Sequence, residues 1–228
     1  MLHKGFECSF YFIRHAESER NLESHLVGGR CPTVPLSQRG MLQAAALGER
    51  LRDEKIPIDF AYTSPTMRAY DTAAIALTTI HYPLDAIVQV EALNEINQGD
   101  WEAERRDNVY HRNNLLYIMR KGPTFAPPNG ESQERVEQRI TNWVHDTFIY
   151  NREFVRSHNK ASIAIFSHAI TLKALFHSIM GFDRRFIYLM HCDNASISEF
   201  TYNERGWQPK RINDVAHVNK VGYLSQKF

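Results

Sequence analysis

Short apolar runs alternate with helix-forming stretches along most of this 228-residue chain. Runs of this length, bounded by polar or turn-forming residues, are typical of strands buried within a sheet. We predict strands at residues 10–13, 58–62, 87–90, 162–166 and 196–201. Because strands alternate with helices, the chain is expected to form an α/β fold. The expected form is a three-layer sandwich with a mostly parallel central sheet flanked by helices.

Three of the helix-forming stretches have clear start signals. Residues 43–51 are strongly helical, and Ser37 is the predicted N-cap of that helix. Pro65 suits the first position of the next helix, where a missing N–H costs nothing. A long amphipathic helix is predicted from about Glu131, and a further helix at residues 169–180. The apolar stripe of the long helix consists of Val136, Ile140, Val144 and Phe148.

The stretch 101–130 is polar and ends in Pro127-Pro128-Asn129-Gly130, which indicates a loop. We interpret it as an insertion or lid within one domain that covers residues 1–228. Its basic residues either select an anionic leaving group or form a solvated face balanced by nearby acids. They are Arg105, Arg106, His111, Arg112, Arg120 and Lys121.

The charge balance argues against partners that are attracted by a strong overall field. The 27 Lys and Arg residues against 26 Asp and Glu give a net charge of +1, so neither nucleic acid nor a membrane is an expected partner. The three cysteines form no C-x-x-C pair, which disfavours a disulfide framework or a cysteine zinc site. No run reaches membrane-spanning length, and no apolar targeting segment follows the start. We expect a cytoplasmic protein, with its oligomeric state left open.

Polar side chains suited to phosphate chemistry follow four of the predicted strands. They are Arg14 and His15, Ser64 with Arg68 one helical turn later, Glu95, and Ser167 with His168. Because the carboxyl ends of parallel strands meet at one edge of a sheet, these side chains are expected to lie close together. The sequence therefore predicts one anion site built from segments far apart in the chain.

The cations and the nucleophile fit a reaction at a phosphate monoester. Arg14 and Arg68 would bind the oxygens of a group that carries about two negative charges. The amide of Asn21 adds a neutral donor. His15 would attack phosphorus, because an imidazole is often unprotonated near neutral pH.

Glu95 is the candidate acid that protonates the departing oxygen. A protonated His168 would bridge phosphoryl oxygens, and the backbone N–H of Ala169, at a helix start, is a further anion donor. Other carboxylates within sequence reach keep the choice of acid open. They are Glu17, Glu91 and Glu102.

Six segments carry a recognisable series of motifs, in order, between about residue 10 and about residue 200. They are Arg14-His15-Ala16-Glu17-Ser18 with Asn21, the segments 36–44, 64–73, 93–102 and 129–132, and Ser167-His168-Ala169. Together they resemble the histidine phosphatase superfamily, the phosphoglycerate-mutase-like proteins of branch 1. The resemblance implies a ping-pong reaction through a phosphohistidine on His15, with no metal and no cofactor. It also implies that Gly28 and Gly29 approach the substrate with their backbone.

The residues after Glu95 favour a phosphatase over a mutase. Mutases of this family carry an Arg-His-Tyr-Gly stretch there, whereas this chain has Ile-Asn-Gln-Gly-Asp-Trp-Glu at 96–102, typical of the phosphatases. We expect hydrolysis of a phosphorylated small molecule. The alternative is a 2,3-bisphosphoglycerate-dependent phosphoglycerate mutase, and the second alternative is a protein phosphatase or a binding module on the same fold. The segment 30–35 departs from the family's usual Asp-rich stretch, so the sequence does not name the ester.

Overall fold

The strands form a six-stranded sheet in the computed structural model, which describes residues 4–221. Their order across the sheet is β3-β2-β4-β1-β5-β6. The strands are β1 (Glu7–Arg14), β2 (Phe60–Thr63), β3 (Ile87–Gln89), β4 (Lys160–Ser167), β5 (Ile197–Asn203) and β6 (Gly206–Asp214). The four strands β3, β2, β4 and β1 run parallel, whereas β5 is antiparallel to β1 and to β6.

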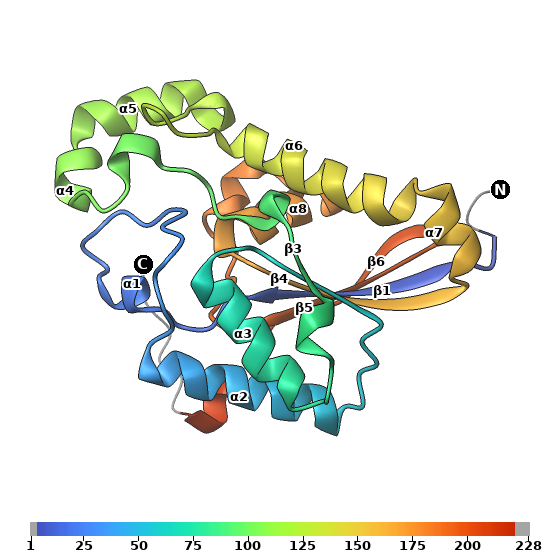
Figure 1. Ribbon diagram of the computed structural model, residues 1–228. Helices are drawn as coiled ribbons and strands as arrows, with labels where there is room; N and C mark the ends of the chain where they lie inside the picture. The colour runs from blue at the N-terminus through green and yellow to red at the C-terminus, as the bar shows by residue number, and fades with distance from the viewer. Residues whose placement is uncertain (1–3, 222–228) are drawn as a thin grey trace.

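Helices cover both faces of this sheet, and the predicted three-layer α/β architecture is confirmed (Figure 1). Helices α2 and α3 lie on one face, and α6, α7 and α8 lie on the other. The helices are α1 (Glu19–Leu22), α2 (Gln38–Asp53), α3 (Met67–Thr78), α4 (Arg106–Val109), α5 (Arg112–Lys121), α6 (Gln133–Val144), α7 (Arg152–Ser157) and α8 (Ala169–Met180).

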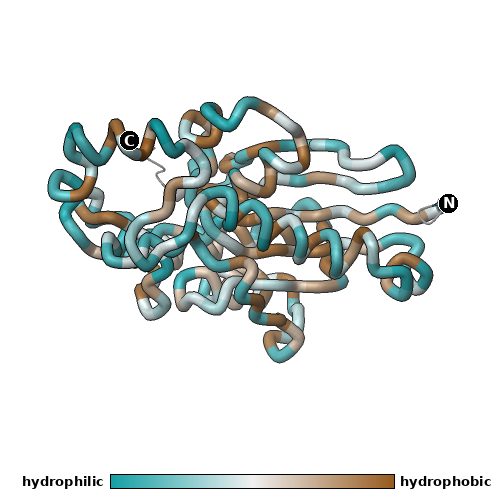
Figure 2. The backbone as a smooth tube through the Cα atoms, turned by 90° about the horizontal axis from the view of Figure 1, so that it is seen from above, coloured by the Kyte–Doolittle hydropathy of each residue, from teal (hydrophilic) through white to brown (hydrophobic). Residues whose placement is uncertain are grey.

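The central strand β1 divides the apolar core into two layers, because successive side chains of a strand point to opposite faces. Phe10 and Phe12 pack into the same buried cluster as Phe176 of α8. Ile13 packs into the opposite cluster with Leu47 of α2. In Figure 2 the extended segments through the middle of the molecule are mainly white to brown, while teal predominates on peripheral helices and loops.

The predicted helix starts are correct at Ser37 and wrong at Pro65. The hydroxyl of Ser37 accepts from the backbone N–H of Gly40 at 2.9 Å and caps α2. Helix α3 begins only at Met67, with Thr66 at its N-cap. A turn closed by the backbone N–H of Thr66 on the hydroxyl of Ser64, at 3.3 Å, delays the helix past the proline.

The amphipathic helix α6 begins at Gln133, two residues later than expected, with Ser132 as its N-cap. Its predicted stripe is fully buried, and the stripe continues past Val144 into a π-helical turn, His145–Ile149, which holds Phe148. The strand β6 was not predicted. Its sequence is largely polar and contains Pro209, which an edge strand tolerates.

The segment 101–130 folds into α4, α5 and short turns that lie beyond the carboxyl ends of the parallel strands (Figure 1). The part of the chain that the structure describes contains no helix long and apolar enough to cross a membrane. The thiols of Cys8, Cys31 and Cys192 are unpaired.

Candidate active site

The ends of β1 and β4 bring the two site histidines together. The strands are adjacent and parallel, with Arg14 opposite Ser167, so the next residue of each strand lies at the same edge. The backbone N–H of His15 donates to the carbonyl of Ser167 at 2.9 Å. The imidazole centroids of His15 and His168 are 5.0 Å apart. The predicted convergence of these two segments is therefore present.

The ring of His15 is held in one orientation and one tautomer. Its Nδ1 lies 2.7 Å from the carbonyl oxygen of Ala16. Because a carbonyl can only accept, Nδ1 carries the proton and Nε2 presents a lone pair. Burial, and then the positive charges of Arg68 and Arg14, hold the pKa of His15 well below its ordinary value. The unprotonated form that a nucleophile requires is thus the favoured one.

Two buried guanidinium groups flank the histidines. Arg14 is 8% exposed, and one of its terminal nitrogens donates to the carbonyl of Cys192 at 2.7 Å. Its buried Nε has no hydrogen-bond partner among residues 4–221. Arg68 is 4% exposed and donates to three backbone carbonyls of the loop 29–31 at 2.8 to 3.1 Å. Arginine remains charged even when burial lowers its pKa, so both groups supply fixed positive charge.

His168 is fully buried, and its contacts define its proton. A guanidinium nitrogen of Arg68 lies 3.3 Å from Nδ1, and because guanidinium only donates, Nδ1 accepts. The proton is therefore on Nε2, which donates to the hydroxyl of Ser64 at 2.9 Å. Burial, Arg68 and the other nearby cationic groups hold the pKa of His168 well below its ordinary value. These contacts favour a neutral His168, in contrast to the protonated ring expected from the sequence.

A chain of hydrogen bonds continues from His168 to the surface. The hydroxyl of Ser64 donates to Oδ1 of Asn94 at 2.7 Å, and the amide nitrogen of Asn94 donates to the carboxylate of Glu91. Sequence reasoning placed Ser64 at a strand end but missed Asn94. Its position immediately before the candidate acid is the only signal that the sequence offers.

The carboxylate of Glu95 lies at the N-terminus of α8, the helix that begins after His168. It accepts from the backbone N–H groups of Ile96 at 2.9 Å and of Ile170 and Thr171 at 3.2 Å. A negative charge is stabilised at a helix N-terminus. The charge of Glu95 also partly offsets the burial that lowers the pKa of Arg68. The candidate acid is thus fixed on the same helix start as the second histidine.

The alternative carboxylates hold backbone segments in place. Glu17 accepts from the hydroxyl of Ser37 at 2.8 Å, at the start of α2. Glu102 accepts from the backbone N–H groups of Arg30 at 2.8 Å and Cys31 at 3.1 Å. Both carboxylates are therefore accounted for as supports of the surrounding loops, and Glu95 stays our candidate for the acid.

Asn21 belongs to a small amide network beside His15. Its Oδ1 accepts from the backbone N–H of Ser18 at 3.0 Å and from the side-chain amide of Asn194 at 3.2 Å. The same amide of Asn194 donates to the backbone carbonyl of His15 at 3.0 Å. Sequence reasoning missed Asn194, because it lies in the loop before β5 and far from every motif.

The predicted backbone donors lie at the edges of the site. Ala169 is the first residue of α8. Gly29 has a φ of 153°, and a Cβ there would lie 2.3 Å from a carboxylate oxygen of Glu102. Gly28 has open space where a Cβ would project. Within residues 4–221, no group of three or more His, Cys, Asp or Glu side chains is placed to hold a metal ion.

The chain is similar in sequence and in fold to several known proteins. A 2,3-bisphosphoglycerate-dependent phosphoglycerate mutase of Bartonella henselae is 29% identical over 199 residues, which cover 86% of this chain and 93% of the mutase. The structure of Bacillus stearothermophilus YhfR matches with a TM-score of 0.77 and 26% identity, over 92% of this chain and 99% of that one.

The alpha-ribazole phosphatase of Shigella flexneri has the same fold, with a TM-score of 0.76 and 24% identity over 91% of this chain and 97% of that one. The sequence pattern of the histidine phosphatase superfamily, branch 1, matches residues 10–215. The chain therefore belongs to the histidine phosphatase superfamily.

Proposed function

We propose that this protein hydrolyses phosphate monoesters through a phosphohistidine formed on His15. The observation that carries the proposal is the state of that ring. The proton on Nδ1 is hydrogen-bonded to a carbonyl, so Nε2 has a free lone pair. The two buried arginines, Arg14 and Arg68, lie close to this ring. A tetrahedral dianion placed between Arg14 and Arg68 would meet this lone pair at phosphorus.

The first chemical step forms one bond and breaks one. The lone pair on Nε2 of His15 attacks phosphorus, the ester P–O bond breaks, and the leaving oxygen takes a proton from Glu95. In the second step a water molecule attacks the phosphohistidine while Glu95 accepts a proton from it. The N–P bond breaks, inorganic phosphate leaves, and Nε2 regains its lone pair. Arg14 and Arg68 would hold the phosphoryl oxygens in both steps, and His168 would join them through Nδ1 once the bound dianion favours a proton there.

The surroundings of the segment after Glu95 support hydrolysis over mutase activity. The backbone N–H groups of Asn97 and Gln98 donate to the carboxylates of Glu131 and Glu102 at 2.9 and 3.2 Å. No arginine or histidine occurs between Glu95 and Glu102, so this stretch offers no side-chain cation for a second phosphate. A mutase must bind a bisphosphate, whereas a phosphatase needs only one phosphate subsite.

The proposal includes three expectations about context. The substrate is a phosphorylated small molecule, and a phosphoprotein is the alternative substrate. The protein acts in the cytoplasm, where its three unpaired thiols would stay reduced. Residues 101–130 act as a lid within a single catalytic domain.

The test is to trap the intermediate. The enzyme is mixed with 4-nitrophenyl phosphate that carries ³²P, quenched in base during turnover, and analysed for protein-bound label. Label that is stable in base and released in acid is expected in the unsubstituted enzyme and in a His81→Asn control at an exposed histidine. His15→Asn should carry none. Full labelling or undiminished turnover in His15→Asn would show that another residue is the nucleophile.

The mutase alternative has its own assay. The enzyme is incubated with 3-phosphoglycerate and a trace of 2,3-bisphosphoglycerate, and both 2-phosphoglycerate and inorganic phosphate are followed. Phosphate release without rapid isomerisation is expected. Isomerisation that outpaces phosphate release would replace the hydrolase with a mutase.

A further inference from the structure

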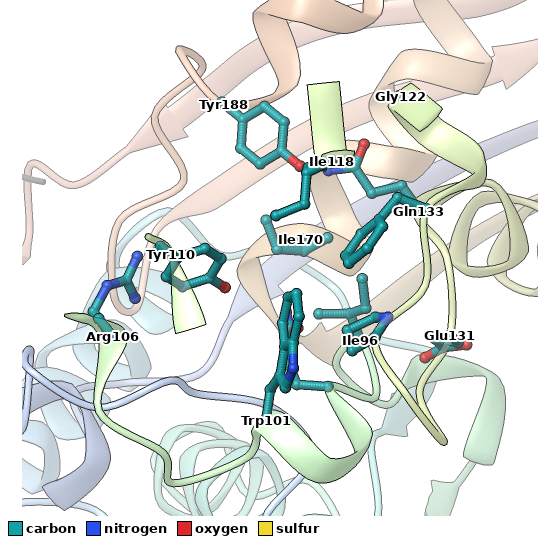
Figure 3. Close-up of a pocket in the computed structure, with 13 residues that line it drawn as sticks. Ile96, Trp101, Arg106, Tyr110, Ile118, Gly122, Glu131, Gln133, Ile170 and Tyr188 are labelled. Carbon is teal, nitrogen blue, oxygen red and sulfur yellow. The ribbon is translucent and has the colours of Figure 1, made fainter. Parts of the chain in front are cut away.

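A cavity of about 180 Å³ lies between the segment 101–130 and the start of α8 (Figure 3). We refer to it as the ring pocket. Ile96 and Ile170 line it, and the backbone N–H groups of these two residues donate to the two carboxylate oxygens of Glu95. The ring pocket therefore adjoins the candidate acid. An ester whose leaving oxygen is at Glu95 would have this space next to its carbon skeleton.

Aromatic side chains form much of the wall. Figure 3 shows Trp101, Tyr110 and Tyr188 around the same space, with Ile118 and Ile170 between them. The indole of Trp101 has its centroid 5.9 Å from the ring of Tyr110, at 77°. Phe125, which also lines the ring pocket, lies 5.3 Å from Trp101 between ring centroids. Such a wall favours apolar and planar groups, which stack on or meet the edges of these rings.

The polar groups of the wall contact other side chains of the protein. The guanidinium of Arg106 lies over the ring of Tyr110, with its carbon 5.1 Å from the centroid. The carboxylate of Glu131 forms ion pairs with Arg139 at 2.9 Å and Arg30 at 3.0 Å. The side-chain amide of Gln133 donates to the hydroxyl of Tyr188. Among the six basic residues of the segment 101–130, Arg106 alone lines the ring pocket.

The volume of the ring pocket indicates the size of group that it can hold. An apolar cavity of about 150 Å³ accommodates one benzene molecule in another protein. The ring pocket, at about 180 Å³, holds one six-membered ring with a small substituent.

We infer that the preferred substrate is a phosphate monoester whose leaving group carries one neutral, apolar ring. This inference rests on the proposed phosphatase activity and adds the chemical class of its substrate. The ring would occupy the space bounded by Trp101, Phe125 and Ile170, while the phosphoryl group meets His15. A leaving group that carries a carboxylate would lose hydration against these rings, and Arg106, over the ring of Tyr110, is the cation of the wall that would offset part of that cost.

The test compares benzyl phosphate with ethyl phosphate. Both release a primary alcohol of similar acidity, so a difference in kcat/KM reports binding of the ring and not the ease of bond cleavage. Benzyl phosphate should be favoured by at least about tenfold, since even one methylene in an apolar pocket is worth about that much. Phe125→Ala should lower kcat/KM for benzyl phosphate alone. Leu116→Ala, at an exposed position of α5 that does not line the pocket, is the matched control.

A second measurement does not depend on turnover or on a variant. Benzylphosphonate and ethylphosphonate, which cannot be hydrolysed at the P–C bond, are compared as competitive inhibitors of the unsubstituted enzyme. Benzylphosphonate should bind at least about tenfold more tightly. Equal rates for the two esters, or equal inhibition by the two phosphonates, would overturn the inference while leaving the phosphatase intact. If the enzyme releases phosphate from neither ester, the phosphatase proposal itself fails, and the substrate class fails with it.

Discussion

Glu95→Gln separates two roles that the structure gives to one carboxylate. The carboxylate caps α8 through the backbone N–H groups of Ile170 and Thr171, and it is also the candidate acid. The loop that carries it is pinned independently, because the hydroxyl of Ser167 donates to the carbonyl of Leu93 at 2.7 Å. Glutamine keeps the length of the side chain and one carbonyl oxygen, but it has no proton to give to a leaving group.

The two roles predict losses of different kinds. The amide nitrogen of glutamine cannot accept the Ile170 N–H that the second carboxylate oxygen accepts, and the charge at the helix N-terminus is lost, so the free energy of unfolding should fall by about 1–3 kcal/mol. Proton transfer by a positioned acid contributes roughly 10²–10⁴-fold to the rate. The variant is therefore expected to stay folded and to lose about that factor in kcat/KM for an alkyl phosphate.

The assay uses two leaving groups. Ethyl phosphate requires a proton on its departing oxygen, whereas 4-nitrophenolate leaves without one, so the loss for 4-nitrophenyl phosphate should be below about tenfold. Glu49→Gln, at an exposed position of α2, is the charge-matched control and should change neither rate. An equal loss for both substrates in Glu95→Gln would refute the acid role and leave Glu95 as a helix cap alone.

Two further predictions concern the buried histidines. Ser64→Ala removes the nearer of two hydroxyls at Nε2 of His168, since that of Thr66 lies at 3.3 Å, and it also removes the donor to Oδ1 of Asn94. The free energy of unfolding measured in urea should therefore fall by about 1–3 kcal/mol. An unchanged value would show that the Ser64 bond is not formed in solution. Because the pKa values of His15 and His168 are lowered on folding, the unfolded chain binds more protons below its ordinary histidine pKa of about 6.5. Stability is then fully present above that pH and falls as the pH is lowered through the interval to the folded pKa values. Urea titrations between about pH 7 and pH 5 should show this loss of stability, and His168→Asn should lose less over the same interval. If the free energy of unfolding falls equally with pH in both proteins, His168 does not have a lowered pKa in the folded state.

The strand ends were predictable because each parallel strand is a short apolar run with a polar residue after it. Arg14, His15, Ser64 and His168 are each at or next to the end of β1, β2 or β4, so the order of strands in the sheet is enough to bring them together. The start of α3 was not predictable from Pro65. A hydroxyl–backbone turn competed with the preference of proline for a first helical position.

The groups that support the site were not predictable, because packing places them and no local pattern does. The carbonyl of Cys192 that holds Arg14 comes from 178 residues further along the chain. The amide of Asn194 reaches the carbonyl of His15 across 179 residues. Neither contact has a sequence signal, since any residue offers a carbonyl and asparagine is common in loops. The proton positions on both histidines depend on such contacts, which explains why the protonated His168 expected from the sequence differs from the neutral ring that its contacts favour.

Binding of a phosphate dianion should change the protonation of His168 in a way that can be measured. Both guanidiniums are held by carbonyl dipoles. Burial, and then the charges of these guanidiniums, lower the pKa values of His15 and His168 and keep both rings neutral. A phosphate dianion bound between Arg14 and Arg68 would offset those charges and favour a proton on His168. Binding of inorganic phosphate should therefore take up protons near neutral pH. Calorimetry in two buffers of different ionisation enthalpy measures this uptake, and His168→Asn should reduce it. Phosphate binding with the same proton balance in both proteins would show that His168 stays neutral when the anion binds, with its Nε2 proton still bonded to Ser64.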